Sequence, residues 1–200
     1  MIEAVRSGLV ARGVPRFDPA TLRCGDSHVF IAGDVDADQP LLHVAAEEGR
    51  IAGENAARFP DIRVHRRSVP LAIAFTEPQT AVLGQTPATL AAGSFAVGQV
   101  DFANQGRSRV IDRAEGLARL YGDRASGRLL GAQLIGPAAE HLAHLLAWTV
   151  QQGLTVDEVL ALPFYHPVVE EGLRTALREL QQALGAPPPV PECVECGPGG

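Results

Sequence analysis

The pattern with the clearest chemical meaning in the sequence is His166-Pro167 with Glu171, a glutamate five residues after the histidine. Pro167 holds the backbone of His166 away from the helical region and can begin a helix. Glu171 then lies one turn into that helix and can reach back to the imidazole. A carboxylate bonded to one ring nitrogen fixes the tautomer and makes the other nitrogen more basic. The spacing therefore predicts a general acid/base pair, or else a structural contact at a helix start.

A second pattern lies near the start of the chain, where the apolar run 29–32 stops at Gly33-Asp34. A strand that ends in Gly-Asp presents a carboxylate at the carboxyl edge of a sheet, where α/β proteins place cofactors. Asp34 can accept hydrogen bonds from ribose-type hydroxyls, and Gly33 permits a close approach. The helix expected from Leu41 points its first amides toward the same region. The alternative is a surface turn capped by Asp34.

The third pattern is a pair of cysteines, Cys193 and Cys196, in a proline-rich tail. Two thiols at this spacing can close a disulfide or bind a soft metal, or they are incidental residues of a disordered tail. The remaining cysteine, Cys24, is expected to be a structural or exposed thiol. We expect no metal site at His141 and His144, because no carboxylate or thiol completes a ligand set.

The elements that would position these residues change in character along the chain. One strand and one helix (29–32 and 41–58) precede a polar, basic stretch, and strands and helices of a different arrangement follow it. We therefore expect an α+β fold with an antiparallel sheet flanked by helices, preceded by a strand-helix piece of an α/β domain. The expected strands of the sheet are 71–75, 80–83, 94–101, 117–121 and 129–135, and the expected helices are 86–92, 137–152, 155–160 and 168–184.

Composition excludes several classes of function. Of the 200 residues, 46% are hydrophobic and 20% charged, which is enough to bury a core. The net charge is −6 and no basic run occurs, so nucleic acid is not an expected partner. No apolar run is long enough to span a membrane, and the N-terminus lacks the apolar core of a signal peptide. We therefore expect a cytoplasmic protein with reduced thiols.

Taken together, five segments resemble one family. Residues 29–34 and 39–43 are similar to the second flavin motif and the loop that follows it in the flavin-dependent pyridine nucleotide–disulfide oxidoreductases. This family includes dihydrolipoamide dehydrogenase, glutathione reductase and mercuric reductase. Residues 75–84, 130–137 and 166–171 resemble the opening, the central strand and the HPxxxE signature of its dimerisation domain. The resemblance spans residues 12–184 and favours the dihydrolipoamide dehydrogenase-like branch.

The resemblance implies a role for each matched residue. Asp34 would bond a ribityl hydroxyl of FAD beside Gly33, and the backbone amides of Leu41, Leu42 and His43 would face the flavin ring. His166 would exchange protons with the substrate thiol or the charge-transfer cysteine, and Glu171 would orient it. In the family this histidine serves the active site of the other subunit, and its bond to proline is typically cis. The resemblance thus implies a homodimer, a small-molecule or protein disulfide substrate, and NAD(P) bound by another part of the enzyme.

Parts of the family pattern are absent from this sequence. It contains neither of the two GxGxxG loops nor the redox-active CxxxxC. We therefore expect residues 1–60 to be the end of an FAD-binding domain, 61–68 a linker, 69–184 the dimerisation domain and 185–200 a flexible tail. On its own the chain should bind FAD weakly or not at all and transfer no hydride. The alternatives are a stand-alone, non-catalytic dimerisation module and a mercuric reductase-like metal-handling protein that uses Cys193 and Cys196.

Overall fold

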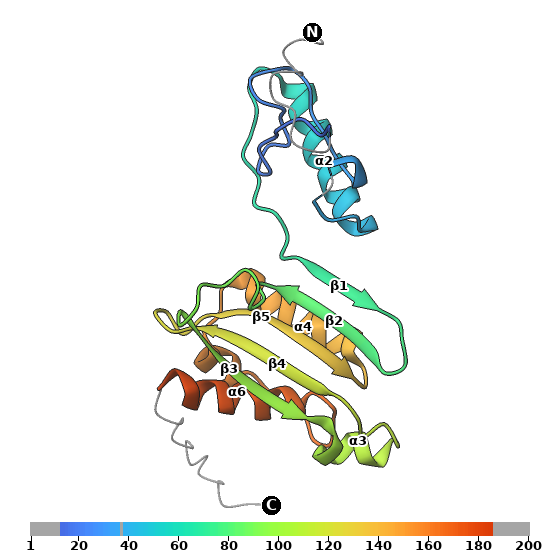
Figure 1. The fold of residues 1–200 in the computed structure, drawn as a ribbon, viewed down its shortest axis with the longest axis vertical. Helices are drawn as coiled ribbons and strands as arrows, with labels where there is room; N and C mark the ends of the chain where they lie inside the picture. Colours follow the sequence, from blue (N-terminus) through green and yellow to red (C-terminus); the bar gives the residue numbers. More distant parts are fainter. Residues whose placement is uncertain (1–12, 37, 186–200) are drawn as a thin grey trace, which may run out of the picture. The chain divides into compact units, whose positions relative to one another are not determined.

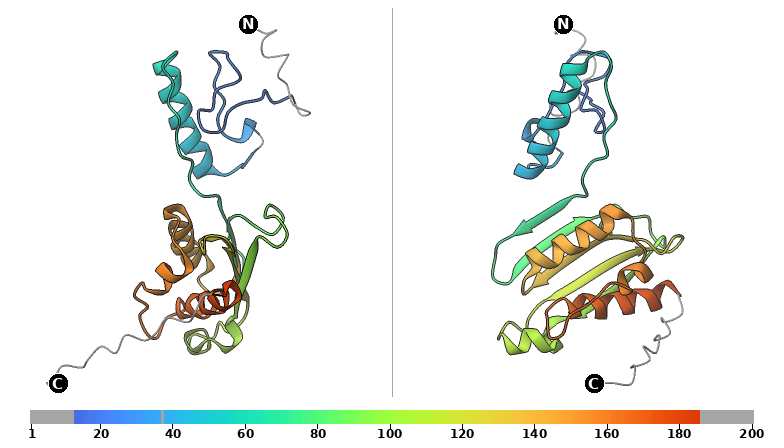
Figure 2. Two further views of the ribbon diagram at one scale, coloured as in Figure 1. Left: turned by 90° about the vertical axis from the view of Figure 1, so that its left-hand side faces the viewer. Right: turned by 180° about the vertical axis from the view of Figure 1, so that it is seen from behind.

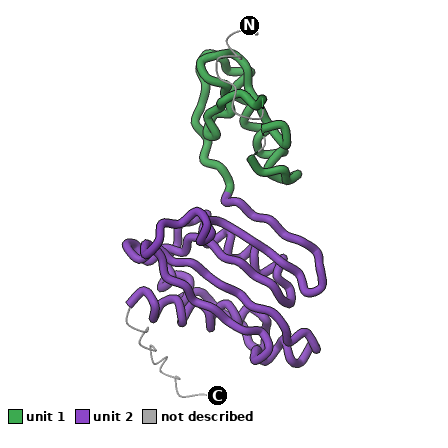
Figure 3. The backbone as a smooth tube through the Cα atoms, in the orientation of Figure 1, with its two compact units in different colours: residues 1–68 green, residues 69–200 purple. Residues whose placement is uncertain are grey.

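The protein consists of two compact units, residues 1–68 and 69–200 (Figure 3). The computed structural model describes residues 13–36 and 38–185. Among these residues no helix has the length and apolar character needed to cross a membrane.

The second unit is built on a five-stranded antiparallel sheet with the strand order β1-β2-β5-β4-β3 (Figure 1). Alternation of buried and exposed residues defines its faces, as in β3, where every second residue points into the core. The central pair is β5 with β4, in which Leu120 lies opposite Ala132. The strands are β1 (Leu71–Ala74), β2 (Gln79–Gly84), β3 (Phe95–Asp101), β4 (Leu117–Asp123) and β5 (Leu129–Gly136).

Helices cover one face of this sheet (Figure 2). α4 (Ala139–Gln152) packs on β2 and β5, and α6 (Glu171–Leu184) packs on β3 and β4. The short α5 (Val156–Leu160) connects them and begins with a capping box between Thr155 and Glu158. The predicted α+β class and antiparallel sheet are confirmed. The core between helices and sheet contains Leu83, Leu120, Leu142, Leu146, Leu177 and Leu180, all almost fully buried.

The contact between β3 and α6 is unusually close because Gly98 faces the helix. A Cβ atom at this position would lie 2.2 Å from the carbonyl oxygen of Ala176 and 2.4 Å from the amide nitrogen of Leu180. Only glycine therefore allows this approach. The result is that the strand directly supports the helix that begins at Glu171.

The first unit contains α2 (Leu42–Arg58) and a short 3-10 turn, η1 (Asp34–Asp36). Residues 13–33 fold back on α2 and bury a small core of Leu22, Ile51 and Ala52. The expected strand 29–32 is wrong as a regular strand, because only an isolated bridge between Arg23 and Phe30 forms there. A strand of a parallel sheet needs neighbouring strands, and the described residues of this unit supply none.

The segment 61–68, expected to be a linker, is instead held against the first unit. The side chain of Asn55 donates to the carbonyl of Arg63 and accepts from its amide, and the amide of His65 donates to the carbonyl of Ala20. Arg67 bonds to the carboxylate of Glu48. The polar groups of this segment therefore pair with groups of the first unit.

Two further expectations about local structure need correction. Residues 86–92 form turns rather than a helix: the amides of Thr89 and Leu90 both donate to the Thr86 carbonyl, but this single turn does not continue as a helix. The last helix starts at Glu171 and not at 168, because residues before it turn around Pro167. The sequence did not predict η2 (Phe102–Asn104) or α3 (Gly106–Val110), which follow β3.

Candidate active site

The predicted pair of His166 and Glu171 forms in the structure. The Nδ1 atom of His166 lies 3.0 and 3.1 Å from the two carboxylate oxygens of Glu171. Because an ionised carboxylate only accepts hydrogen bonds, Nδ1 carries a proton, and in the neutral ring the free lone pair is then on Nε2. The imidazole is 80% exposed, so a reactant has access to it.

The ionised state of Glu171 is reinforced by two donors. The hydrogen bond from His166 lowers the pKa of Glu171 below its ordinary value, and the amide of Val168, 3.2 Å from Oε2, lowers it further. The carboxylate therefore stays charged over the pH range in which an imidazole exchanges protons. This arrangement suits a group that orients a histidine and stabilises its protonated form.

The turn that carries His166 is fixed from outside its own segment. Gln105 donates from Nε2 to the carbonyl oxygen of Val168 at a distance of 2.8 Å. The fully buried Phe102 lies against Gly172, where a Cβ atom would be 2.8 Å from the ring. Residues of η2 and the start of α3 thus hold the beginning of α6 in place. The His166–Pro167 peptide bond is cis.

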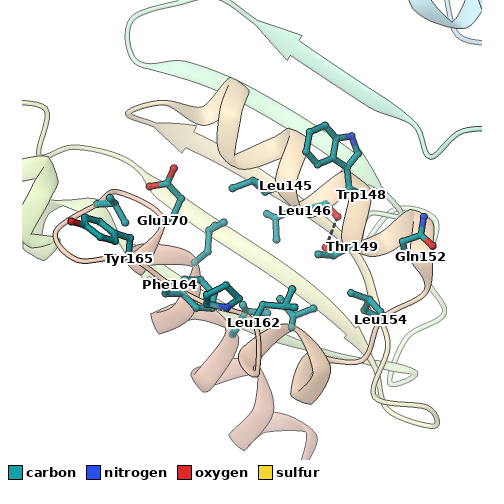
Figure 4. A pocket seen from close by; sticks show the side chains of 15 residues that line it. Leu145, Leu146, Trp148, Thr149, Gln152, Leu154, Leu162, Phe164, Tyr165 and Glu170 are labelled. Carbon is teal, nitrogen blue, oxygen red and sulfur yellow. Dashed lines mark hydrogen bonds between the residues drawn. The ribbon is translucent and has the colours of Figure 1, made fainter.

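An apolar hollow of ≈ 460 Å³ lies beside this turn (Figure 4). Its wall on α4 includes Leu145 and Trp148, and its opposite wall includes Leu162, Phe164 and Tyr165. Trp148 is 63% exposed, and Tyr165 is exposed as well. Large apolar side chains gathered on one open face are typical of a surface that another molecule covers.

In the first unit, the predicted cofactor-binding residues lie on η1 and at the start of α2. Gly33 has a φ of 76°, and a Cβ atom there would lie 3.3 Å from that of Ala45. Asp34 and His43 are exposed, and Leu41 is half-buried. Leu42 is 88% exposed, which is unusual for leucine.

The start of α2 presents backbone amides that can donate hydrogen bonds. Leu41 occupies its N-cap position and makes no side-chain capping bond, and the first turn holds no acidic residue. The amides of the first helical turn have no acceptor within the helix itself. Together with the Asp34 carboxylate and the exposed Leu42, these amides form an edge with hydrogen-bonding and apolar character.

The cysteines divide between described and undescribed parts of the chain. Cys193 and Cys196 lie outside the described residues, so their pairing stays a prediction. Cys24 is a buried free thiol, and burial raises its pKa, which makes it a structural residue. Within residues 13–36 and 38–185, no group of three potential ligands could hold a metal ion.

Sequence reasoning missed the residues that hold the His166 turn. Phe102, which packs on Gly172, and Gln105, which bonds to Val168, come from a distant segment, and no local spacing connects them with the turn. The one signal in the sequence was Gly172 directly after Glu171. A glycine in a helix is costly unless another group approaches closely.

Comparison with known proteins identifies the family to which this chain belongs. Residues 70–177 match the family described as pyridine nucleotide-disulphide oxidoreductase, dimerisation domain. The chain belongs to this family. The family resemblance inferred from the sequence motifs is therefore confirmed.

The curated relatives point to one branch of the family. The chain is 36% identical over 161 residues to a dihydrolipoyl dehydrogenase of Haloferax volcanii, covering 79% of this chain and 33% of the relative. It is 26% identical over 188 residues to that of Bacillus subtilis, covering 93% and 39%. The mitochondrial enzyme of Rattus norvegicus is 29% identical, with coverage of 80% and 31%. The chain thus spans about a third of the length of the curated relatives it matches.

Solved structures share the fold. LpdA from Mycobacterium tuberculosis superimposes with a TM-score of 0.72 at 24% identity, covering 86% of this chain and 38% of that one. The HOCl-induced flavoprotein disulfide reductase RclA from Escherichia coli has a TM-score of 0.69 at 20% identity, with coverage of 84% and 39%.

Proposed function

We propose that this chain is the C-terminal part of an FAD-dependent NAD(P)H:disulfide oxidoreductase similar to dihydrolipoyl dehydrogenase. In this proposal His166 and Glu171 supply an acid/base pair to the active site of the partner subunit. The observation that carries it is the bidentate contact of Glu171 with Nδ1 of an imidazole that is otherwise open to solvent.

The chemistry assigned to the pair is proton transfer at sulfur. Nε2 of His166 accepts the proton of a substrate thiol, and the resulting thiolate can attack a disulfide sulfur. In the opposite direction the imidazolium returns its proton to the leaving thiolate. Glu171 stabilises the imidazolium by its charge and keeps the ring oriented throughout.

The edge formed by Gly33, Asp34 and the first turn of α2 fits FAD. Its exposed carboxylate suits the ribityl hydroxyls, and the uncapped amides and exposed apolar Leu42 suit the carbonyls and flat face of a flavin ring. Bound FAD would pass electrons between a nicotinamide nucleotide and the disulfide. The nucleotide site and most of the flavin site would belong to polypeptide beyond these motifs.

We also propose that the chain forms a homodimer through residues 69–184, with the apolar face around Trp148 in the interface. Two features support this assignment. The family that the chain belongs to is defined by its dimerisation domain, and Trp148, Tyr165 and Leu162 expose apolar surface on one side of the second unit. A second copy of the chain would remove this surface from water.

The experiment that tests the proposed function uses the product of the complete natural reading frame that includes these residues. The purified product is examined for bound flavin and for NAD(P)H-dependent reduction of a panel of disulfides that includes lipoamide. We expect stoichiometric flavin and reductase activity. A dimeric product with neither would contradict the proposal and support a non-catalytic dimerisation module.

That module is the second candidate function, because the family match covers only the dimerisation domain. The third candidate, metal handling by Cys193 and Cys196, is distinguished from the other two by a metal-binding measurement. It requires stoichiometric binding of a soft metal that is lost when both cysteines are replaced by serine. Neither alternative needs the contact between His166 and Glu171.

A further inference from the structure

Two carboxyl side chains, Asp36 and Glu48, are buried together in the first unit. Asp36 is 6% exposed and Glu48 is 1% exposed. Both residues are tied to Gly33, since Glu48 accepts a hydrogen bond from the Gly33 amide and the Asp36 amide donates to the Gly33 carbonyl. Two neighbouring buried carboxylates cannot both remain charged without a large cost, so the arrangement requires a proton or a cation between them.

Glu48 is committed to accepting hydrogen bonds. Its Oε2 accepts from the amide of Gly33 at 2.6 Å, and its Oε1 accepts from Nη2 of Arg67 at 2.5 Å. The bond to Glu48 raises the pKa of Arg67, although burial alone would lower it. Both oxygens of Glu48 therefore already accept a hydrogen bond from another residue.

Asp36 has the opposite environment. Its Oδ1 accepts from the amide of Asp38 at 2.9 Å, but its Oδ2 is buried without a hydrogen-bond partner among the described residues. Burial raises the pKa of Asp36, the adjacent Glu48 raises it further, and only the Asp38 amide acts against them. A proton on Oδ2 would complete the hydrogen bonding, because it could be donated to Glu48.

We propose that Asp36 and Glu48 share one proton, held on Oδ2 of Asp36, and that this proton fixes the Gly33–Asp36 turn against α2. The turn is closed by the Asp36 amide, which donates to the carbonyl of Gly33 at 2.9 Å. In this arrangement Glu48 accepts hydrogen bonds from both ends of the turn, from the Gly33 amide and from the protonated carboxyl group of Asp36.

A proton accounts for these contacts better than a metal ion does. Among the described residues, no third carboxylate, histidine or cysteine joins Asp36 and Glu48 in a potential ligand group. Arg67 already supplies the positive charge next to Glu48, and Glu47 accepts from Arg67 on the other side. Asp38 adds a further negative charge near Asp36, which also favours its neutral form.

The consequence concerns the candidate cofactor edge and, in this respect, rests on the proposed function. Gly33 and Asp34 belong to the turn that the shared proton holds. When the pH rises and the proton leaves, Asp36 and Glu48 repel each other and the turn loses one of its two attachments. Asp36 and Glu48 are therefore positioning residues for the edge that would contact the flavin.

The test is an NMR titration of the full 200-residue chain without flavin. The carboxyl carbon of Asp36 and the amide of Gly33 are followed from pH 3 to pH 9. We expect Asp36 to titrate above the ordinary value of about 3.9, and the Gly33 amide to shift with the same midpoint. An Asp36 midpoint at or below the ordinary value, or a Gly33 amide that does not follow Asp36, would overturn the proposal.

Two variants sharpen the result. Asp36→Asn keeps a donor for Glu48, so it should preserve the fold and abolish the Gly33 transition. Asp38→Asn, the matched control, should keep that transition. Persistence of the Gly33 transition in Asp36→Asn would assign it to another group and overturn the proposal. No step of this test involves flavin or reductase activity. The proton-sharing proposal can therefore fail while the proposed function holds, and the proposed function can fail while the proton-sharing proposal holds.

Discussion

Replacing Gly98 with alanine tests the close approach of β3 to α6, on which the position of Glu171 depends. The added Cβ would lie 2.2 Å from the carbonyl oxygen of Ala176 and 2.6 Å from Cβ of Leu180. Two of the three nearest atoms belong to the helix backbone, so rotation of a side chain cannot relieve the clash. Strand and helix must therefore separate by roughly 1 Å, and such overpacking costs about 1–3 kcal/mol.

The assay is urea unfolding of the full chain, followed by fluorescence of its single tryptophan. Trp148 lies on α4 and therefore reports on the unfolding of the second unit. With a denaturant slope of about 2 kcal/mol/M, a loss of 2 kcal/mol lowers the urea midpoint by about 1 M.

Gly106→Ala is the matched control, because a Cβ there meets no atom within 4 Å. Its free energy of unfolding should stay within about 0.5 kcal/mol of that of the unsubstituted chain. An equal stability for Gly98→Ala and Gly106→Ala would refute the reasoning that the strand supports the helix through this glycine.

Three further predictions concern the first unit, the interface and the acid/base pair. Asn55→Ala leaves the backbone groups of Arg63 and Thr21 unpaired, so hydrogen exchange of α2 should speed up by an amount equivalent to about 3 kcal/mol. Trp148→Arg should convert the proposed dimer to a monomer in sedimentation, whereas Val110→Arg, also at an exposed apolar residue, should not. The pKa of Glu171 is depressed, so its stabilising contribution is present above about pH 4.3 and lost as pH falls through the folded value. Glu171→Gln should therefore be less stable than the unsubstituted chain near neutral pH, and the two unfolding curves should converge in acid.

Local sequence signals predicted those parts of the fold that neighbouring residues determine. The spacing of His166 and Glu171 predicted their contact, which the structure contains. Thr155 predicted a helix start, and Gly153 predicted the end of α4, where its φ is 69°. In each case the partners lie within five residues of each other in the sequence, so a short sequence window holds all the information.

The parts of the fold and site that the sequence did not predict depend on contacts between segments that are distant in the sequence. Gln105 and Phe102 support the His166 turn from more than sixty residues away in the sequence. The polar, basic composition of segment 61–68 predicts a linker, yet Asn55 and Glu48 of α2 form hydrogen bonds with it. Polar composition is compatible with either solvation or mutual hydrogen bonding, and only the tertiary structure distinguishes them.

The edge that carries Asp34 was predicted as the end of a regular strand. In the structure it is a turn, fixed by the Gly33 amide on Glu48. The sequence patterns predicted no role for Glu48, because a glutamate in the middle of a helix usually faces solvent. Its burial follows from the donors that surround it, and these come from Gly33 and Arg67, fifteen and nineteen residues away.

The most direct test of the proposed acid/base role is to replace His166 in the product of the complete reading frame. Disulfide reduction by His166→Gln is compared with that by His141→Gln, which removes another exposed histidine that lies 3.5 Å from a glutamate. We predict that His166→Gln lowers kcat by about 10²–10⁴-fold with flavin content and dimer state unchanged, while His141→Gln keeps full activity. A His166→Gln protein with unchanged kcat would contradict the assignment of His166 as the catalytic acid/base.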